Sequence, residues 1–242
     1  MTLAAGGTQA AEIKVLSANG VKAVIGDLAP RFEGASGHKV VVGLGEAGEL
    51  RHRILDGEAF EVALLPAATL SELAKAGKIA TDSDRPLART DVGLALRAGA
   101  APPEAGSADA LKRLLLTAKT IVITDPASGG VSGVHIAEVC QRLGIADAVK
   151  PKLKLTRGVL NAELVARGEA DLAVQLAHEI RTVPGVVFVA LPSEFRRSIV
   201  FSGGIAGAAG QPGAAKQLLE FIASATGRAA IAEKGMEPAA AQ

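Results

Sequence analysis

Aromatic residues are nearly absent from this chain of 242 residues: they make up 2% of it, and it contains no Trp and no Tyr. Surfaces that stack nucleic-acid bases and sugar sites built on Trp both need aromatic faces, so the composition disfavours both. The formal net charge is only +1, which provides no basic field that could track phosphates. We therefore expect no nucleic-acid partner.

Cysteine and histidine are too few or too scattered to suggest a metal site. Cys140 is the single cysteine of the sequence, which excludes an intrachain disulfide framework and any multi-cysteine metal site. The four histidines, His38, His52, His135 and His178, show no pair at the spacing of metal ligands. We expect neither a metal nor a cofactor.

Long apolar runs are also missing, because no stretch of about 18 apolar residues, the length of a membrane-spanning helix, occurs. Residues 1–12 lack the basic start and the apolar stretch of a signal peptide. Two interpretations remain open. The chain is a periplasmic protein whose leader has been removed, which is our expectation, or it is cytoplasmic.

The sequence does contain a repeated pattern of a short apolar strand followed by residues at helical spacing. This alternation predicts parallel sheets with right-handed crossovers, and because it restarts after the polar stretch 81–89 we predict two similar α/β lobes. The predicted strands are 13–16, 40–42, 62–65, 92–96, 121–124, 153–155, 171–175, 186–190 and 198–203, and the predicted helices are 21–32, 49–56, 69–76, 108–117, 134–143, 161–167, 213–223 and 227–234.

Three junctions between a strand and a helix, at residues 17–20, 43–48 and 128–133, are rich in Gly, Ser and Asn. Free backbone N–H groups and the positive end of the helix dipole favour an anion at such a position. Parallel α/β sheets also bind their ligands at the carboxyl ends of strands. The same residue types are common in ordinary turns and helix caps, but three such junctions in two lobes favour a cleft lined by neutral donors.

The candidate ligand-contacting residues come from these junctions and their surroundings. His135 follows the third junction, and Gln175 ends a predicted strand, so both are expected near the cleft. His178 and His135 each fit a structural role as well as a ligand contact. The full candidate set is Ser17, Asn19, Gly20, Glu46, Ala47, Gly48, Ser128, Ser132, Gly133, His135 and Gln175.

Residues 43–48, Gly-Leu-Gly-Glu-Ala-Gly, match the G-x-G-x-x-G pattern of dinucleotide-binding loops. A dinucleotide site needs an acidic residue at the end of the next strand, and the strand predicted at 62–65 has none. Glu46 would in addition repel a pyrophosphate. The hypothesis of a dinucleotide-dependent enzyme therefore rests on this one motif.

The three junctions, together with residues 164–171 and 215–238, resemble the molybdate-type substrate-binding proteins of ABC transporters. The resemblance extends from about residue 13 to residue 238. It implies the type 2 periplasmic binding fold, with two α/β lobes of mainly parallel sheets joined by a two-strand hinge near residues 81–90 and 193–203. It also implies a first lobe at 11–84, a second lobe at 85–200, and a return to the first lobe with the C-terminal helices at 201–242.

Two positions depart from the molybdate-binding pattern, which has a serine in each of the first two junctions. Gly20 and Ala47 stand at the corresponding positions here, so both hydroxyl donors are missing. Each lost donor to a buried oxyanion costs ~1–3 kcal/mol, and we expect that molybdate is not the ligand. Residues 16–20, 124–135 and 174–175 are more similar to a branch containing aconitate isomerase and organic-acid binders.

The resemblance implies an extracytoplasmic solute-binding protein that captures a small anion for ABC-type uptake. We expect this anion to be an organic acid rather than molybdate. We expect a monomer that meets a transporter membrane subunit. The alternative is an isomerase acting on a tricarboxylate such as aconitate, which needs a general base close to an acidic C–H bond. Glu46 and His135 are the candidates for that role.

Overall fold

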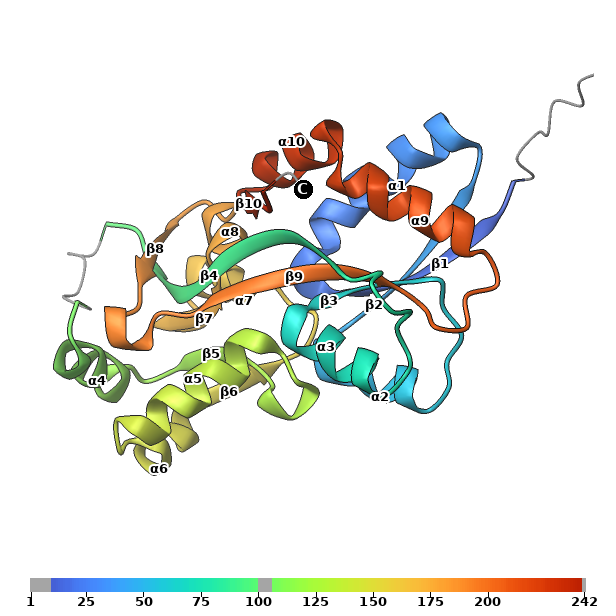
Figure 1. Ribbon diagram of the computed structural model, residues 1–242. Helices are drawn as coiled ribbons and strands as arrows, with labels where there is room; N and C mark the ends of the chain where they lie inside the picture. The colour runs from blue at the N-terminus through green and yellow to red at the C-terminus, as the bar shows by residue number, and fades with distance from the viewer. Residues whose placement is uncertain (1–9, 100–105, 241–242) are drawn as a thin grey trace, which may run out of the picture.

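The computed structural model describes residues 10–99 and 106–240, which form two α/β lobes lying side by side (Figure 1). Two long strands, β4 (Arg85–Arg97) and β9 (Ser198–Ile205), connect the lobes. Residues 1–9, on which most of the expectation of a removed leader rests, lie outside the described residues. Among the residues described, no helix has the length and apolar character needed to cross a membrane.

The first lobe combines the beginning and the end of the chain. Its central strand β1 pairs in parallel with β2 on one side and with β3 on the other. Most of β1 is buried, as in parallel strands that helices cover on both faces. The elements are β1 (Glu12–Ala18), α1 (Lys22–Ser36), β2 (Lys39–Gly45), α2 (Ala47–Leu55), β3 (Val62–Pro66), α3 (Ala67–Lys75), α9 (Pro212–Ala223), α10 (Ala225–Glu233) and β10 (Glu237–Pro238).

Helices α1, α9 and α10 cover one face of this sheet, and α2 and α3 cover the other (Figure 1). The apolar spacing that predicted the first helix is the spacing that α1 buries, through Val24, Ile25, Leu28 and Phe32. Helix α1 ends at Gly37, whose φ of 75° is left-handed, a conformation that glycine adopts at little cost.

The second lobe repeats the arrangement around β5, which pairs in parallel with β6 and with β7. Strand β7 is buried along its whole length. The elements are α4 (Ala108–Thr117), β5 (Ile121–Thr124), α5 (Val131–Arg142), α6 (Ala146–Val149), β6 (Leu153–Thr156), α7 (Asn161–Ala166), β7 (Leu172–Leu176), α8 (Ala177–Arg181) and β8 (Val186–Ala190), with short 3-10 helices η1 (Asn19–Val21), η2 (Pro126–Ser128), η3 (Lys150–Lys152) and η4 (Ser193–Phe195) between elements of both lobes.

Strand β4 belongs to both lobes because its two halves have different neighbours. Its first half pairs antiparallel with β9 and β10, and its second half pairs with β7 and β8. At about 3.3 Å per residue its 13 residues reach roughly 40 Å, enough to extend from one lobe into the other. The strand order is β2-β1-β3-β9-β4-β7-β5-β6.

The predicted fold class, two similar α/β lobes of mainly parallel strands joined by two crossing strands, is confirmed. The crossing strand that the resemblance placed near residues 81–90 is present, since Arg85 already pairs with Gly203 of β9, although the apolar pattern alone predicted a strand only from residue 92. One local prediction was wrong. Gly43 and Gly45 belong to strand β2 and pair with Leu16 and Ala18, so residues 43–45 are not the loop that a dinucleotide site requires.

Candidate ligand-binding cleft

The loops at the carboxyl ends of the parallel strands face each other where the lobes meet. The first lobe contributes the loops after β1 and β2, and the second lobe those after β5, β6 and β7. The lobes touch at two glycines, since a Cβ built on Gly48 would lie 2.7 Å from the carbonyl oxygen of Ser128 and 2.9 Å from Gly129 Cα. The structure is therefore a closed form of the cleft, in which backbone packs against backbone.

The Glu46 carboxylate lies between the two lobes. Its Oε1 accepts a hydrogen bond of 2.9 Å from Asn19 Nδ2 in the first lobe and one of 3.1 Å from the Gly158 backbone N–H in the second. Its Oε2 faces Gly130, because a Cβ built there would lie 3.2 Å away. Glu46 is also the N-cap residue of α2, and its own N–H donates to Glu49.

The candidate hydroxyl groups are turned toward the protein in this closed form. Ser128 is buried and donates to the backbone carbonyl of Asp125 at 2.7 Å, and Ser17 is buried beside its own strand end. The Ser132 hydroxyl lies 3.5 Å from that of Thr124. Gly133 packs on the Thr124 carbonyl so closely that a Cβ would lie 1.8 Å from its oxygen, so this position serves the packing of α5 on β5.

Gln175 connects the end of β7 to a second carboxyl group, that of Glu179. Its Oε1 accepts a hydrogen bond of 2.9 Å from the Ala162 N–H in the first turn of α7, which leaves the amide nitrogen to donate to Glu179. Burial raises the pKa of Glu179 to about 7, against the opposing effects of Gln175 and Lys22, and the nearby charge of Glu46 raises it further.

Sequence reasoning missed Glu179. The signal was present, because Glu179 follows Gln175 by four residues and so lies in the first turn after a strand end. Helix α8 has only five residues, however, and shows no periodicity that would place this side chain toward the cleft.

The two candidate histidines are both buried and bonded to protein groups. His135 Nε2 lies 2.7 Å from the Phe195 carbonyl oxygen, and burial lowers the pKa of its imidazole. His178 Nδ1 lies 3.1 Å from Thr90 Oγ1 on β4, and its ring also hydrogen-bonds the backbone of Gly20. Burial lowers the pKa of His178 to about 4. Its neutral imidazole therefore connects the loop after β1, through Gly20, to the crossing strand β4, through Thr90.

An ion pair also crosses between the lobes. Arg157, in the loop after β6, donates to Asp125 of its own lobe at 2.7 Å and to Glu49 of the first lobe at 3.0 Å. Arg157 is exposed, so this bridge is screened by solvent and contributes on the order of 0–1 kcal/mol to closure.

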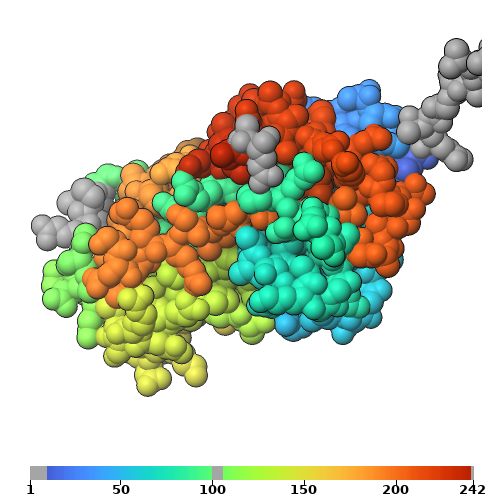
Figure 2. Space-filling model, viewed as in Figure 1, coloured from blue at the N-terminus to red at the C-terminus, as the bar shows by residue number. Residues whose placement is uncertain are grey.

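An open part of the cleft remains beside β9, as a pocket of about 410 Å³. The first turn of α3, the first turn of α5 and the start of β9 form its walls, and Arg197 is its cationic residue. In the space-filling view the teal residues of α3 and the yellow-green residues of α5 flank the orange strand β9 on this face (Figure 2). Two helix N-termini line the pocket, and Arg197, which also pairs with Glu138 at 2.8 Å, adds a positive charge that is partly compensated.

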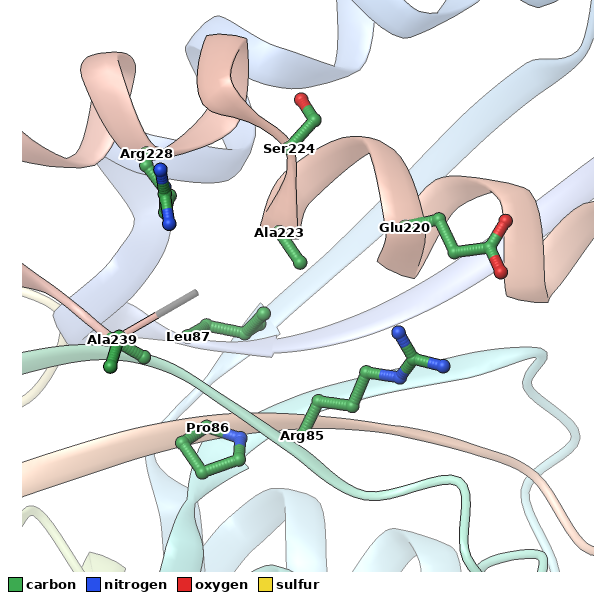
Figure 3. A pocket seen from close by; sticks show the side chains of 9 residues that line it. Arg85, Pro86, Leu87, Glu220, Ala223, Ser224, Arg228 and Ala239 are labelled. Atoms are coloured by element: carbon green, nitrogen blue, oxygen red, sulfur yellow. The ribbon is translucent and has the colours of Figure 1, made fainter. Parts of the chain in front are cut away.

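A second pocket, of about 220 Å³, lies in the first lobe between α9, α10 and the start of β4 (Figure 3). Arg85 extends toward it from the strand and Arg228 from the helix. It shares no residue with the loops of the cleft.

Comparison with known proteins gives the chain its family. The bacterial extracellular solute-binding protein family matches residues 13–237. The chain is 30% identical to aconitate isomerase from Pseudomonas sp over 237 residues, which cover 95% of the chain and 89% of that protein. It is 32% identical to the molybdate-binding protein ModA from Azotobacter vinelandii over 167 residues, or 68% of the chain and 64% of that protein.

The fold agrees with these relatives. The solved periplasmic molybdate-binding protein of Azotobacter vinelandii superposes with a TM-score of 0.75 at 20% identity, over 95% of this chain and 100% of that chain. The resemblance drawn from the sequence is thereby confirmed. The chain belongs to the bacterial extracellular solute-binding protein family.

Proposed function

We propose that this protein binds a small organic acid between its two lobes in the periplasm and presents it, as a monomer, to the membrane subunit of an ABC-type transporter. The observation that carries the proposal is the meeting of loops from both lobes around Asn19, Glu46 and Gly158 in a chain of the solute-binding family. A ligand that bonds to both lobes stabilises the closed form, and closure is the signal that a transporter can read.

An organic acid fits better than molybdate because two hydroxyl donors are missing. Gly20 and Ala47 offer no hydroxyl donor where the molybdate-type pattern has serine, and a Cβ on Gly20 would lie 2.6 Å from the Phe201 ring, so this position is tightly packed.

In this proposal the ligand is held mainly by uncharged donors. The backbone amides near Gly48 and at Gly133 belong to the first turns of α2 and α5, and the side-chain amides are those of Asn19 and Gln175. The hydroxyls of Ser17, Ser128 and Ser132 would reach a ligand only after the loops rearrange, because they now face protein groups.

A thermal-shift screen tests the proposal with citrate, malate and cis-aconitate against molybdate and sulfate. A ligand present at about 100 times its Kd adds about 2.7 kcal/mol to stability, which raises the Tm of a chain of this length by roughly 5–11 °C. We expect such a shift with at least one organic acid. Asn19→Ala should reduce this Tm shift. Gln217→Ala, which removes an amide side chain of α9 outside the cleft, should leave the shift unchanged. Absence of any shift across the panel would refute the proposal.

The second candidate function is isomerisation of a tricarboxylate, which the similarity to aconitate isomerase over 95% of the chain favours. A carboxylate would remove a proton from the methylene carbon, the double bond would move by one position, and the proton would return to the other end. Glu46 and Glu179 supply carboxyl groups at the cleft, whereas the ring of His135 is bonded to Phe195. Incubation with cis-aconitate in deuterated water, followed by NMR, would reveal the trans isomer and any deuterium exchanged into carbon.

A further inference from the structure

The Glu46 carboxylate makes the contacts that a bound anion would be expected to make. It takes one hydrogen bond from a side-chain amide of the first lobe, at 2.9 Å, and one from a backbone N–H of the second lobe, at 3.1 Å. Glu46 is buried, and no Lys or Arg lies within 4.0 Å of its carboxylate among the described residues. The closed cleft therefore already contains a negative charge that is held by neutral donors from both lobes.

A carboxylate in this position has opposite effects on two kinds of anion. A carboxylate accepts hydrogen bonds and donates none, so it can bond only to a ligand that carries its own O–H group. Molybdate and sulfate offer no such hydrogen at neutral pH, whereas a hydroxy acid keeps its alcohol O–H even when its carboxyl groups are ionised. Oε1 already accepts from Asn19 and Gly158, and the carboxylate also accepts from the Glu49 backbone N–H in the capping box of α2, so a ligand hydroxyl would bond to Oε2, on the side of Gly130.

We propose that Glu46 determines the specificity of the cleft: it accepts a hydrogen bond from an O–H of a hydroxy acid or a partly protonated carboxylic acid, and it rejects fully ionised oxyanions such as molybdate and sulfate. This inference rests on the proposed function and names the ligand class of the same cleft. Burial raises the pKa of the neighbouring Glu179 carboxyl to about 7, and the charge of Glu46 adds to that rise.

The test compares the wild-type protein with Glu46→Gln by calorimetric titration at neutral pH. The glutamine keeps the size of the side chain and an acceptor oxygen for Asn19 and Gly158, but it removes the charge. We expect Glu46→Gln to bind molybdate or sulfate at least about tenfold more tightly than the wild type and citrate or malate about tenfold more weakly. Glu72→Gln, which removes an exposed carboxylate of the same lobe paired with Arg51, is the matched control and should leave both affinities unchanged.

The molybdate and sulfate titrations decide the inference even without a native ligand. A gain in affinity on Glu46→Gln supports it, and an equal change for all probes, as expected if Glu46 only caps α2, overturns it. Glu46→Asp keeps the charge and should still reject both oxyanions. If the glutamine variant does not fold, this aspartate variant provides the test, and tight binding of molybdate or sulfate by it would overturn the inference. Failure of the wild type to bind any organic acid would count against the proposed function and would leave this comparison intact.

Discussion

Closure of the cleft depends on the absence of a side chain at Gly48. A Cβ at this position would lie 2.7 Å from the Ser128 carbonyl oxygen and 2.9 Å from Gly129 Cα. Both are backbone atoms of the opposite lobe, so no side-chain rotation can relieve the overlap. Gly48→Ala should therefore keep the lobes apart while it leaves each lobe folded.

The magnitude follows from where the overlap occurs. Overpacking by a methyl group costs ~1–3 kcal/mol, and here the cost arises only in the closed form because the two loops separate on opening. Ligand binding requires closure, so we expect affinity to fall about 5- to 150-fold. The Tm of the ligand-free protein should change little or rise, since alanine is a better helix former than glycine.

Calorimetric titration with the organic acid identified by thermal shift measures this loss. Gly26→Ala is the matched control, because Gly26 lies on an exposed part of α1 and a Cβ there meets nothing within 4 Å. Wild-type affinity in Gly48→Ala would refute the reasoning, because it would mean that the ligand-bound form does not bring these two backbones together.

Two further predictions concern buried groups. Burial lowers the pKa of His178 to about 4, below its unfolded value of about 6.5, so the unfolded chain takes up the proton first as pH falls. The free energy of unfolding should therefore decrease by roughly 3 kcal/mol as pH falls from about 6.5 to about 4. His178→Asn should flatten that part of the curve of stability against pH, measured by urea unfolding. Burial raises the pKa of the Cys140 thiol to about 11, so a disulfide reagent should label it slowly in the folded protein and rapidly in denaturant, and fast labelling of the native protein would contradict the buried position.

Strong local patterns made most of the fold predictable. The helix at 108–117 and the strands at 121–124 and 186–190 have the predicted bounds, because apolar runs or apolar residues at helical spacing mark them in the sequence. The start of β4 was not predictable in this way. Its residues 85–89, Arg-Pro-Leu-Ala-Arg, contain no β-branched or aromatic residue, and they form a strand because β9 and β10 supply hydrogen-bonding partners from far along the chain.

The cleft was predictable only as a set of loops. Gly, Ser and Asn at strand ends indicate where an anion site can form, but the direction of each side chain depends on packing between the lobes. Ser128 shows this, since its hydroxyl bonds back to Asp125. Glu179 shows the converse, because its spacing from Gln175 was visible in the sequence, but only the short helix α8 and the hydrogen bond to Gln175 bring its carboxyl next to that strand end.

The ionisation of Glu179 distinguishes the two candidate functions, because they respond to pH in opposite directions. With a pKa of about 7, this carboxyl loses its charge as pH falls, so binding of an anion should tighten below neutral pH. A carboxylate that acts as a base must be ionised, so isomerisation through Glu179 should instead accelerate as pH rises through about 7. Glu179→Gln should remove the pH dependence of binding in the first case and abolish turnover in the second, and titrations and rate measurements on either side of neutral pH will separate them.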